Sequence, residues 1–271
     1  MYHAAMSRNY VTHAIIFSVK PLGENNSSIC FLTKESGIVY ATMYGGPKSK
    51  LRSLAAQWNS GTAYLYCKER GELERNVKLS DFDVRNYHLS FRENLRKMYA
   101  ASLAAELILK TKCAGSFEKC WQLASGFFDG LDIASDAQCS AGLARFLWRY
   151  LALLGVQPDA SSCALCGKLL TGNNAQNAVV YDAGENVFLC HACAEHSIAH
   201  GALQKREAYR FILSAEAAQY LDAVAKLAPA QSRALPLDER ALHDIQHLVF
   251  FLAEQAAGTK LKSLETGAGI L

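Results

Sequence analysis

The sequence predicts a multidomain α+β protein, with a small β-barrel at the N-terminus and an α-helical remainder that carries a zinc hairpin with four cysteines. Three observations support this prediction. Five segments of strand-like composition fall within the first 80 residues, helical patterns dominate the rest, and two Cys-x-x-Cys pairs interrupt the helical part. We therefore expect a barrel domain over residues 1–80 and a helical domain over residues 81–271, with the zinc hairpin at about 160–197.

The first 80 residues alternate between strand-like and turn-like composition. Segments rich in β-branched and aromatic residues are separated by turn residues such as Pro21-Leu22-Gly23 and Gly45-Gly46. The expected strands cover residues 10–20, 27–33, 38–44, 62–68 and 73–79. Five short strands in this length match the OB-fold, a five-stranded and partly open barrel that commonly binds single-stranded nucleic acid.

The charge of the chain is unevenly distributed. The 271 residues include 28 Lys and Arg and 25 Asp and Glu, a net charge of only +3, which by itself gives no indication of a nucleic-acid partner. Residues 1–80, however, contain ten basic and five acidic residues, whereas the remaining 191 contain 18 basic and 20 acidic residues. The positive excess therefore lies on the predicted barrel, where it is either a solvated face or a contact surface for phosphates.

The loop at residues 45–53 is the first candidate for such a surface. Lys48, Lys50 and Arg52 alternate along it beside two glycines, which allow close approach of the backbone to a phosphate. A solvated loop with no partner is the alternative. Four further cations are candidate DNA contacts: Arg8, Lys20, Arg92 and Arg96.

The helical part begins after the barrel. Apolar residues at helical spacing, with stop signals at Gly155 and Pro158, predict helices over residues 84–112, 117–128, 138–154, 214–227 and 237–257. His243 and His247 share one helical face, but with no third ligand in view we assign them a structural role. Residues 260–264 resemble a short basic tail.

The strongest chemical signal is a set of four cysteines. Cys163 and Cys166 are followed, after 23 intervening residues, by Cys190 and Cys193, a spacing typical of a structural Zn²⁺ site. Strand-like segments at residues 178–182 and 186–189 predict a hairpin that brings the two pairs together. We expect zinc to stabilise a small segment that has little core of its own.

Other uses of these cysteines remain open. A redox Cys-x-x-Cys needs only one pair in a βαβ setting, and none is visible. A catalytic zinc needs an open position; His191 and His196 are near enough to replace a thiolate, although four thiolates already complete a tetrahedron. Thiols that stay reduced without a metal are the third possibility.

The sequence contains no recognised catalytic motif, such as a P-loop, G-x-S-x-G or H-E-x-x-H. We therefore expect a protein that is not an enzyme. Five cysteines stand singly, which is typical of a reducing compartment, and neither a signal peptide nor an apolar stretch of about 20 residues is apparent. These features predict a soluble protein of the cytoplasm.

Several segments together are similar to the bacterial DNA repair and recombination family RecO. The most specific is Leu153-Leu154-Gly155-Val156-Gln157-Pro158 ahead of Cys163-x-x-Cys166-Gly167, which resembles the family's L-x-x-L-G-x-x-P and C-x-x-C-G motifs. The others resemble its first strand and turn, its first hairpin, its basic loop and its C-terminal end: residues 20–24, 33–37, 45–52 and 260–264.

This resemblance implies an OB-fold followed by a helical zinc domain, with Lys48, Lys50 and Arg52 as DNA contacts and the four cysteines as zinc ligands. It implies a mediator of the RecF pathway, associated with the nucleoid, that binds single- and double-stranded DNA and anneals complementary strands. It also implies help in loading the RecA recombinase, with RecR and the C-terminal tail of the single-stranded DNA-binding protein as partners.

Two other functional classes compete with this one. In the first, the barrel and zinc hairpin form a protein-interaction adapter without intrinsic annealing activity. The second is a zinc hydrolase, in which at least one of the four cysteines would be unligated.

Overall fold

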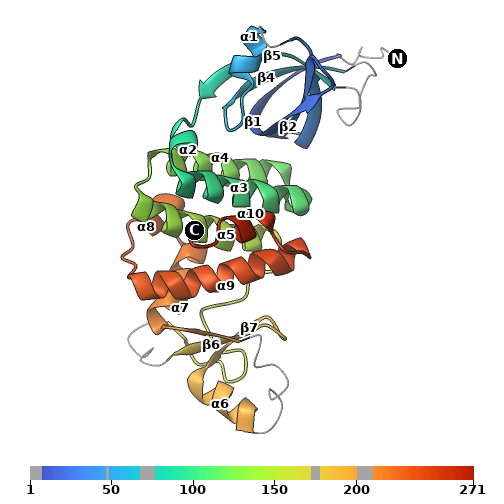
Figure 1. The fold of residues 1–271 in the computed structure, drawn as a ribbon. Helices are drawn as coiled ribbons and strands as arrows, with labels where there is room; N and C mark the ends of the chain where they lie inside the picture. Colours follow the sequence, from blue (N-terminus) through green and yellow to red (C-terminus); the bar gives the residue numbers. More distant parts are fainter. Residues whose placement is uncertain (1–7, 47–48, 68–76, 172–177, 200–209) are drawn as a thin grey trace, which may run out of the picture. The chain divides into compact units, whose positions relative to one another are not determined.

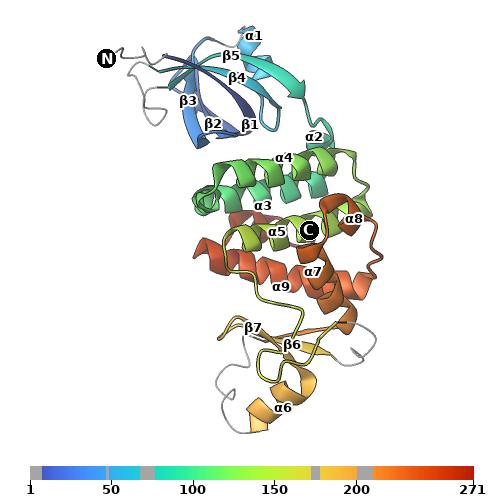
Figure 2. The same ribbon diagram turned by 180° about the vertical axis from the view of Figure 1, so that it is seen from behind.

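A computed structural model describes residues 8–46, 49–67, 77–171, 178–199 and 210–271 (Figures 1 and 2). The chain divides into two compact units. The barrel unit comprises Met1–Asp136 together with Leu261–Leu271, and the hairpin unit comprises Ala137–Lys260. Each unit is described by itself. The domain division at residue 80, predicted from the sequence, falls inside the barrel unit and stays a prediction.

Five strands of the barrel unit close into a barrel in the order β1-β2-β3-β5-β4. The strands are β1 (Asn9–Leu22), β2 (Asn26–Thr33), β3 (Gly37–Met43), β4 (Ser60–Cys67) and β5 (Val77–Asn86). The 14-residue β1 pairs antiparallel with both β2 and β4, and β3 meets β5 in the parallel direction at Thr42 and Lys78. The sheet thus has no free edge among these strands.

Buried and exposed side chains alternate along the strands, which explains why these residues form a barrel. In β4, Ala63, Leu65 and Cys67 point into the barrel core, whereas Tyr64 and Tyr66 between them are partly exposed. Four of the predicted strands are confirmed. The fifth is displaced: β5 runs to Asn86 and includes residues 84–86, which were predicted to be helical. Residues 68–76 lie outside the described part of the chain.

The predicted helix over residues 84–112 is wrong in its first part. After β5, the short helix α2 (Ser90–Glu93) is followed by α3 (Leu95–Lys110). Asn94 separates them, because its extended backbone ends α2 and its side chain accepts the N–H of Lys97 at 3.0 Å to cap α3. The next helix, α4 (Phe117–Ile133), starts at the predicted residue and continues past the predicted end at residue 128.

A cluster of aromatic side chains packs the barrel against α2 and α4 within the barrel unit. Trp58, which follows the short helix α1 (Lys50–Leu54), lies with its ring 6.2 Å from Phe91 of α2 and 5.7 Å from Phe128 of α4. Buried His88 stacks on Phe91, and its Nδ1 lies 2.7 Å from the Trp58 carbonyl while its Nε2 lies 3.1 Å from Asp129. Both ring nitrogens therefore have partners, one on each side of the junction.

Residues 260–264, expected to form a basic tail, are instead docked in the barrel unit by a carboxylate. Glu106 of α3 accepts the backbone N–H groups of Lys262, at 3.1 Å, and Ser263, at 2.8 Å, together with the Ser263 hydroxyl. These residues open the helix α10 (Lys262–Thr266), whose first N–H groups have no partner within the helix. Sequence periodicity missed this because the docking depends on a residue 156 positions away.

The hairpin unit consists of helices and a three-stranded sheet. Its helices are α5 (Asp136–Leu153), α6 (His191–Ala199), α7 (Ala215–Lys226), α8 (Pro229–Arg233) and α9 (Glu239–Ala257). Trp148 of α5 donates its indole N–H to the Leu221 carbonyl of α7 at 2.8 Å. Arg149 donates to the carbonyl of Leu227 and the hydroxyl of Ser232, so polar groups of α5 fix the segment that follows α7.

The sheet has the order β7-β6-β8 and is fully antiparallel. Its strands are β6 (Val179–Asp182), β7 (Val187–Cys190) and β8 (Arg210–Leu213). The predicted hairpin of β6 and β7 is confirmed. No sequence pattern predicted β8, which has only four residues. The rings of Phe211 on β8 and Phe251 on α9 are 4.9 Å apart and hold the strand against the helix. Among the described helices of the chain, none is long and apolar enough to span a membrane.

Gly61 of β4 is a position where the barrel tolerates no side chain. A Cβ there would overlap the Asp83 carbonyl oxygen and lie 2.9 Å from its carbon, beside a register shift between β4 and β5. We expect Gly61→Ala to destabilise the protein by about 1–3 kcal/mol, measured by urea unfolding. The control is Gly126→Ala, because a Cβ at Gly126 of α4 meets open space and should stabilise the helix by about 0.5–1 kcal/mol. Equal effects of the two changes would contradict this packing.

The docking of α10 should depend on pH through Glu106. Partial burial raises the pKa of this carboxyl, but hydrogen bonds from Ser263 and Lys262 outweigh burial and hold the pKa below its ordinary value. The stabilisation is therefore complete above the pKa of an unfolded glutamate and is lost as the pH falls through the lowered, folded value. Glu106→Gln should cost about 1–2 kcal/mol at pH 7 and much less in acid, as measured by unfolding across a pH series. Exposed Glu93→Gln is the control and should change little.

Candidate metal centre and nucleic-acid interface

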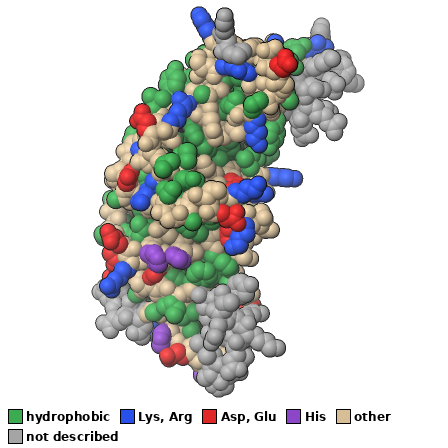
Figure 3. Space-filling view, viewed as in Figure 1, with side chains coloured by type: hydrophobic (Ala, Val, Ile, Leu, Met, Phe, Trp, Pro, Cys, Tyr) green, Lys and Arg blue, Asp and Glu red, His purple; other side chains and the backbone are tan. Residues whose placement is uncertain are grey.

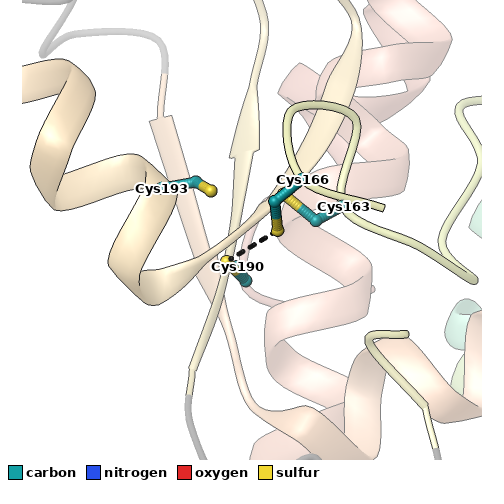
Figure 4. A group of neighbouring side chains, drawn as sticks. All are labelled: Cys163, Cys166, Cys190 and Cys193. Carbon is teal, nitrogen blue, oxygen red and sulfur yellow. Dashed lines mark hydrogen bonds between the residues drawn. The ribbon is translucent and has the colours of Figure 1, made fainter. Parts of the chain in front are cut away.

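The four predicted cysteines converge in the hairpin unit. The Sγ atoms of Cys163, Cys166, Cys190 and Cys193 all lie within 4.8 Å of one another. Figure 4 shows Cys163 and Cys166 on one loop, Cys190 at the end of β7 and Cys193 on α6, with the Cys166 and Cys190 sulfurs 3.8 Å apart. In a tetrahedral site with Zn–S bonds of about 2.3 Å, neighbouring sulfurs are about 3.8 Å apart. The group can therefore hold a metal ion without a large rearrangement.

Local backbone chemistry shapes the first cysteine pair. The N–H of Cys163 donates to the Lys168 carbonyl, and the N–H of Gly167 returns to the Cys163 carbonyl, so the loop closes on itself. Gly167 has φ +71°, a conformation that favours glycine. The N–H of Ala164 donates to the Phe188 carbonyl of β7, which fixes this loop beside the strand that carries Cys190.

The second pair is positioned by a change of secondary structure. β7 ends at Cys190 and α6 begins at the next residue, His191, which the sequence patterns had not indicated. Cys193 therefore lies in the first turn of a helix, close to the last residue of a strand. His191 and His196 belong to α6 but are not part of the four-sulfur group.

The pKa values of two of the four thiols are shifted in opposite directions. Burial raises the pKa of Cys163, but N–H groups of Cys190, Cys166 and Leu165 outweigh it and lower the pKa to about 6. Hydrogen bonds with the thiols of Cys166 and Cys190 raise the pKa of Cys193 to about 12. Cys163 therefore ionises readily, whereas Cys193 keeps its proton. A divalent cation would favour the thiolate form of both cysteines, because it offsets their negative charge.

The predicted basic contacts are spread over the barrel unit. Lys48 lies outside the described residues. The expected flexible loop is in part the short helix α1 (Lys50–Leu54), on which Lys50 is exposed. Its five residues are too few for a periodic signal. The Arg52 guanidinium turns toward the barrel, with one nitrogen 3.3 Å from the Ser27 hydroxyl.

The other four cations differ in their exposure to solvent and in their hydrogen bonds. Arg8, just before β1, and Lys20, near its end, are exposed, whereas Arg96 of α3 is half-buried. Arg92 of α2 donates to the Gln57 carbonyl at 3.2 Å and to the Asn59 side chain at 3.1 Å, so its guanidinium also serves the structure.

The barrel places a row of polar and aromatic side chains on its outer surface. Cross-strand pairs connect Lys20 to Ser28, Ser28 to Thr42, Thr42 to Lys78, and Lys78 to Tyr66, and paired residues point to the same face. We call these five residues the outer row. The Lys78 ammonium also lies 5.7 Å from the ring centre of exposed Tyr44. No local sequence pattern singles out Lys78, because only the strand register brings it beside Tyr66 and Thr42.

Comparison with known proteins identifies the family. The family model "Recombination protein O C terminal" matches residues 92–265, well over half of the chain. The chain belongs to the RecO family. The match runs from α2 into α10 and includes all four cysteines of the candidate metal site.

Curated relatives agree with this RecO assignment. Proteins named DNA repair protein RecO are 27% identical over 172 residues in Synechococcus elongatus, 25% over 158 residues in Lactobacillus acidophilus, and 28% over 170 residues in Nostoc punctiforme. These alignments cover 59%, 57% and 61% of this chain. They span 59%, 60% and 55% of the relatives, so the similarity extends over less than two thirds of their length.

Removal of a metal should loosen the hairpin unit. We expect Cys166→Ser and Cys193→Ser each to lower bound zinc from about one ion per chain and to reduce the thermal stability of that unit. Amide protection of β6 and β7 should fall with it, measured by hydrogen exchange. Cys139→Ala is the matched control, because Cys139 is a buried cysteine of α5 outside the group. Full zinc content in both serine variants would contradict the assignment.

Proposed function

We propose that this protein is a non-enzymatic mediator of DNA repair and homologous recombination in the RecF pathway. It binds single- and double-stranded DNA, anneals complementary strands and helps to load RecA onto DNA coated by the single-stranded DNA-binding protein. The observation that carries this proposal is the RecO family match over residues 92–265, together with relatives named DNA repair protein RecO. RecR and the C-terminal tail of the single-stranded DNA-binding protein are its proposed partners, and the cytoplasm, at the nucleoid, is its proposed location.

We assign the barrel to the OB-fold, as a DNA-binding domain over residues 1–80 that precedes a helical domain over residues 81–271. Its support is the closed order β1-β2-β3-β5-β4, in which the first strand pairs with both the second and the fourth. Five strands in this closed arrangement are typical of small barrels that bind oligonucleotides.

The proposed DNA contacts are the cations of the barrel unit and the outer row. Lys20 and Lys78 neutralise phosphates, while Tyr66 and Tyr44 offer flat rings on which bases stack. Lys48, Lys50, Arg52, Arg8, Arg92 and Arg96 extend this basic surface. Neutralised phosphates reduce the repulsion between two approaching strands, and bases held only by stacking keep their pairing edges free. Both effects favour annealing.

The zinc site is proposed to be structural, with Cys163, Cys166, Cys190 and Cys193 as its four ligands. A hollow beside it is lined by apolar residues including Leu169, Leu170 and Val179, and no carboxylate is among its described lining residues. A hydrolase would need a general base next to an open zinc position. His191 also lines the hollow, but four thiolate ligands would leave no open position on the zinc, which supports a role in stability for the metal.

The deciding experiment is strand annealing over a salt series. Lys48→Ala, Lys50→Ala and Arg52→Ala combined should reduce the annealing rate at least about tenfold at 0.1 M salt. The slope of the logarithm of the DNA-binding constant against the logarithm of the salt concentration should become shallower by about two. The reason is the loss of three cations near the phosphates. Fluorescent oligonucleotides measure both quantities.

A control with the same change in charge separates specific from general effects. Lys226→Ala, Arg233→Ala and Arg240→Ala combined removes three cations of the hairpin unit, from α7, α8 and α9, and should leave annealing near the wild-type rate. Unchanged annealing by the folded barrel variant would exclude the loop as the contact. A wild-type protein that neither binds nor anneals DNA, yet retains protein partners, would favour the adapter function instead.

A further inference from the structure

Two histidines on α9 converge at the surface of the hairpin unit. His243 and His247 are both exposed and one helical turn apart. Their Nε2 atoms are 3.1 Å apart, and their ring centres are 4.3 Å apart. In Figure 3, histidine side chains gather in one patch on the surface of this part of the molecule. The sequence alone indicated a structural role for this pair, but the two ring nitrogens face each other, which calls for a chemical reason.

Two arrangements allow imidazole nitrogens to approach so closely. In the first, one ring donates an N–H to the lone pair of the other, which requires different tautomers. In the second, both lone pairs point at one cation. Nitrogens that share an ion at about 2.0–2.1 Å are about 2.9 Å apart at a right angle and about 3.3 Å apart at the tetrahedral angle. The observed 3.1 Å fits a hydrogen bond and also lies between these values, so a metal ion could replace the shared proton with little movement of the rings.

The helix holds the pair in place. Ile245 and Leu248, on the opposite side of α9, are fully buried, and Asp238 caps the helix by accepting the N–H of Ala241 at 2.6 Å. The two rings therefore project from a fixed backbone, which limits the entropy lost on binding. Exposed Glu239 stands one turn before His243 on the same face, where a carboxylate oxygen favours a cation.

We propose that His243 and His247 form a chelating surface site for a divalent transition-metal ion of the kind that imidazole prefers: Cu²⁺, Ni²⁺ or Zn²⁺. The two Nε2 atoms are the protein ligands, and water completes the coordination. The site is separate from the four-cysteine group, because it uses nitrogen ligands on α9 and shares no residue with it. Affinity should follow the general order for divalent ions, with Cu²⁺ bound most tightly.

The test uses the full-length, untagged protein with its cysteine site loaded with zinc. Titration with NiSO₄ in a calorimeter should show one equivalent of Ni²⁺ without release of zinc. His243→Gln and His247→Gln should each weaken this binding at least about tenfold, because a single imidazole loses the chelate effect. The control is His13→Gln, which removes an exposed histidine of β1 and should leave the binding unchanged.

A second measurement identifies the ligands directly. One equivalent of Cu²⁺ should give an electron paramagnetic resonance spectrum with coupling to two imidazole nitrogens in the wild-type protein and to one in each variant. The proposal is overturned if the wild-type protein binds no additional ion, or if both folded glutamine variants bind Ni²⁺ as tightly as the wild type.

Discussion

The closure of the barrel by β1 is the constraint on which the barrel unit depends. This strand bonds to β2 along one edge and to β4 along the other, so the backbone groups of the five strands find partners without a free edge. Closure also fixes which side chains face outward. A shift of one residue in the pairing of β5 with β4 would turn Lys78 inward and a core residue of β5 outward. The outer row, and with it the proposed DNA contact, therefore follows from strand register rather than from a local motif.

The same barrel explains how the aromatic residues divide between structure and binding. Phe31 and Phe82 fill the barrel core, and Trp58 and Phe91 pack at the junction with the helices. Tyr44 and Tyr66, on the outside, are among the rings that remain available to a ligand. Position in the pleat decides which role a ring has, because alternate residues point to opposite faces.

The hairpin unit has a small sheet that needs stabilisation from outside its own strands. Its sheet has three strands of four residues each, which bury little apolar surface, and a metal held by four cysteines from a loop, a strand and a helix would tie these short elements together. Phe211 and Phe251 add a contact between β8 and α9. The paired histidines lie on α9, which carries none of the four cysteines.

The sequence by itself determined the strands with clear alternation, the longer helices and the spacing of the four cysteines, because each of these signals is local. Tertiary structure alone decided the rest. Part of the basic loop forms the helix α1. β5 extends to Asn86, so the helix expected from residue 84 starts later. The C-terminal residues 261–271 dock on Glu106. Tertiary structure also brought Lys78 beside Tyr44, and it turned the nitrogens of His243 and His247 toward each other. Short elements and distant partners leave no periodic trace, since their stability comes from contacts between residues far apart in the chain.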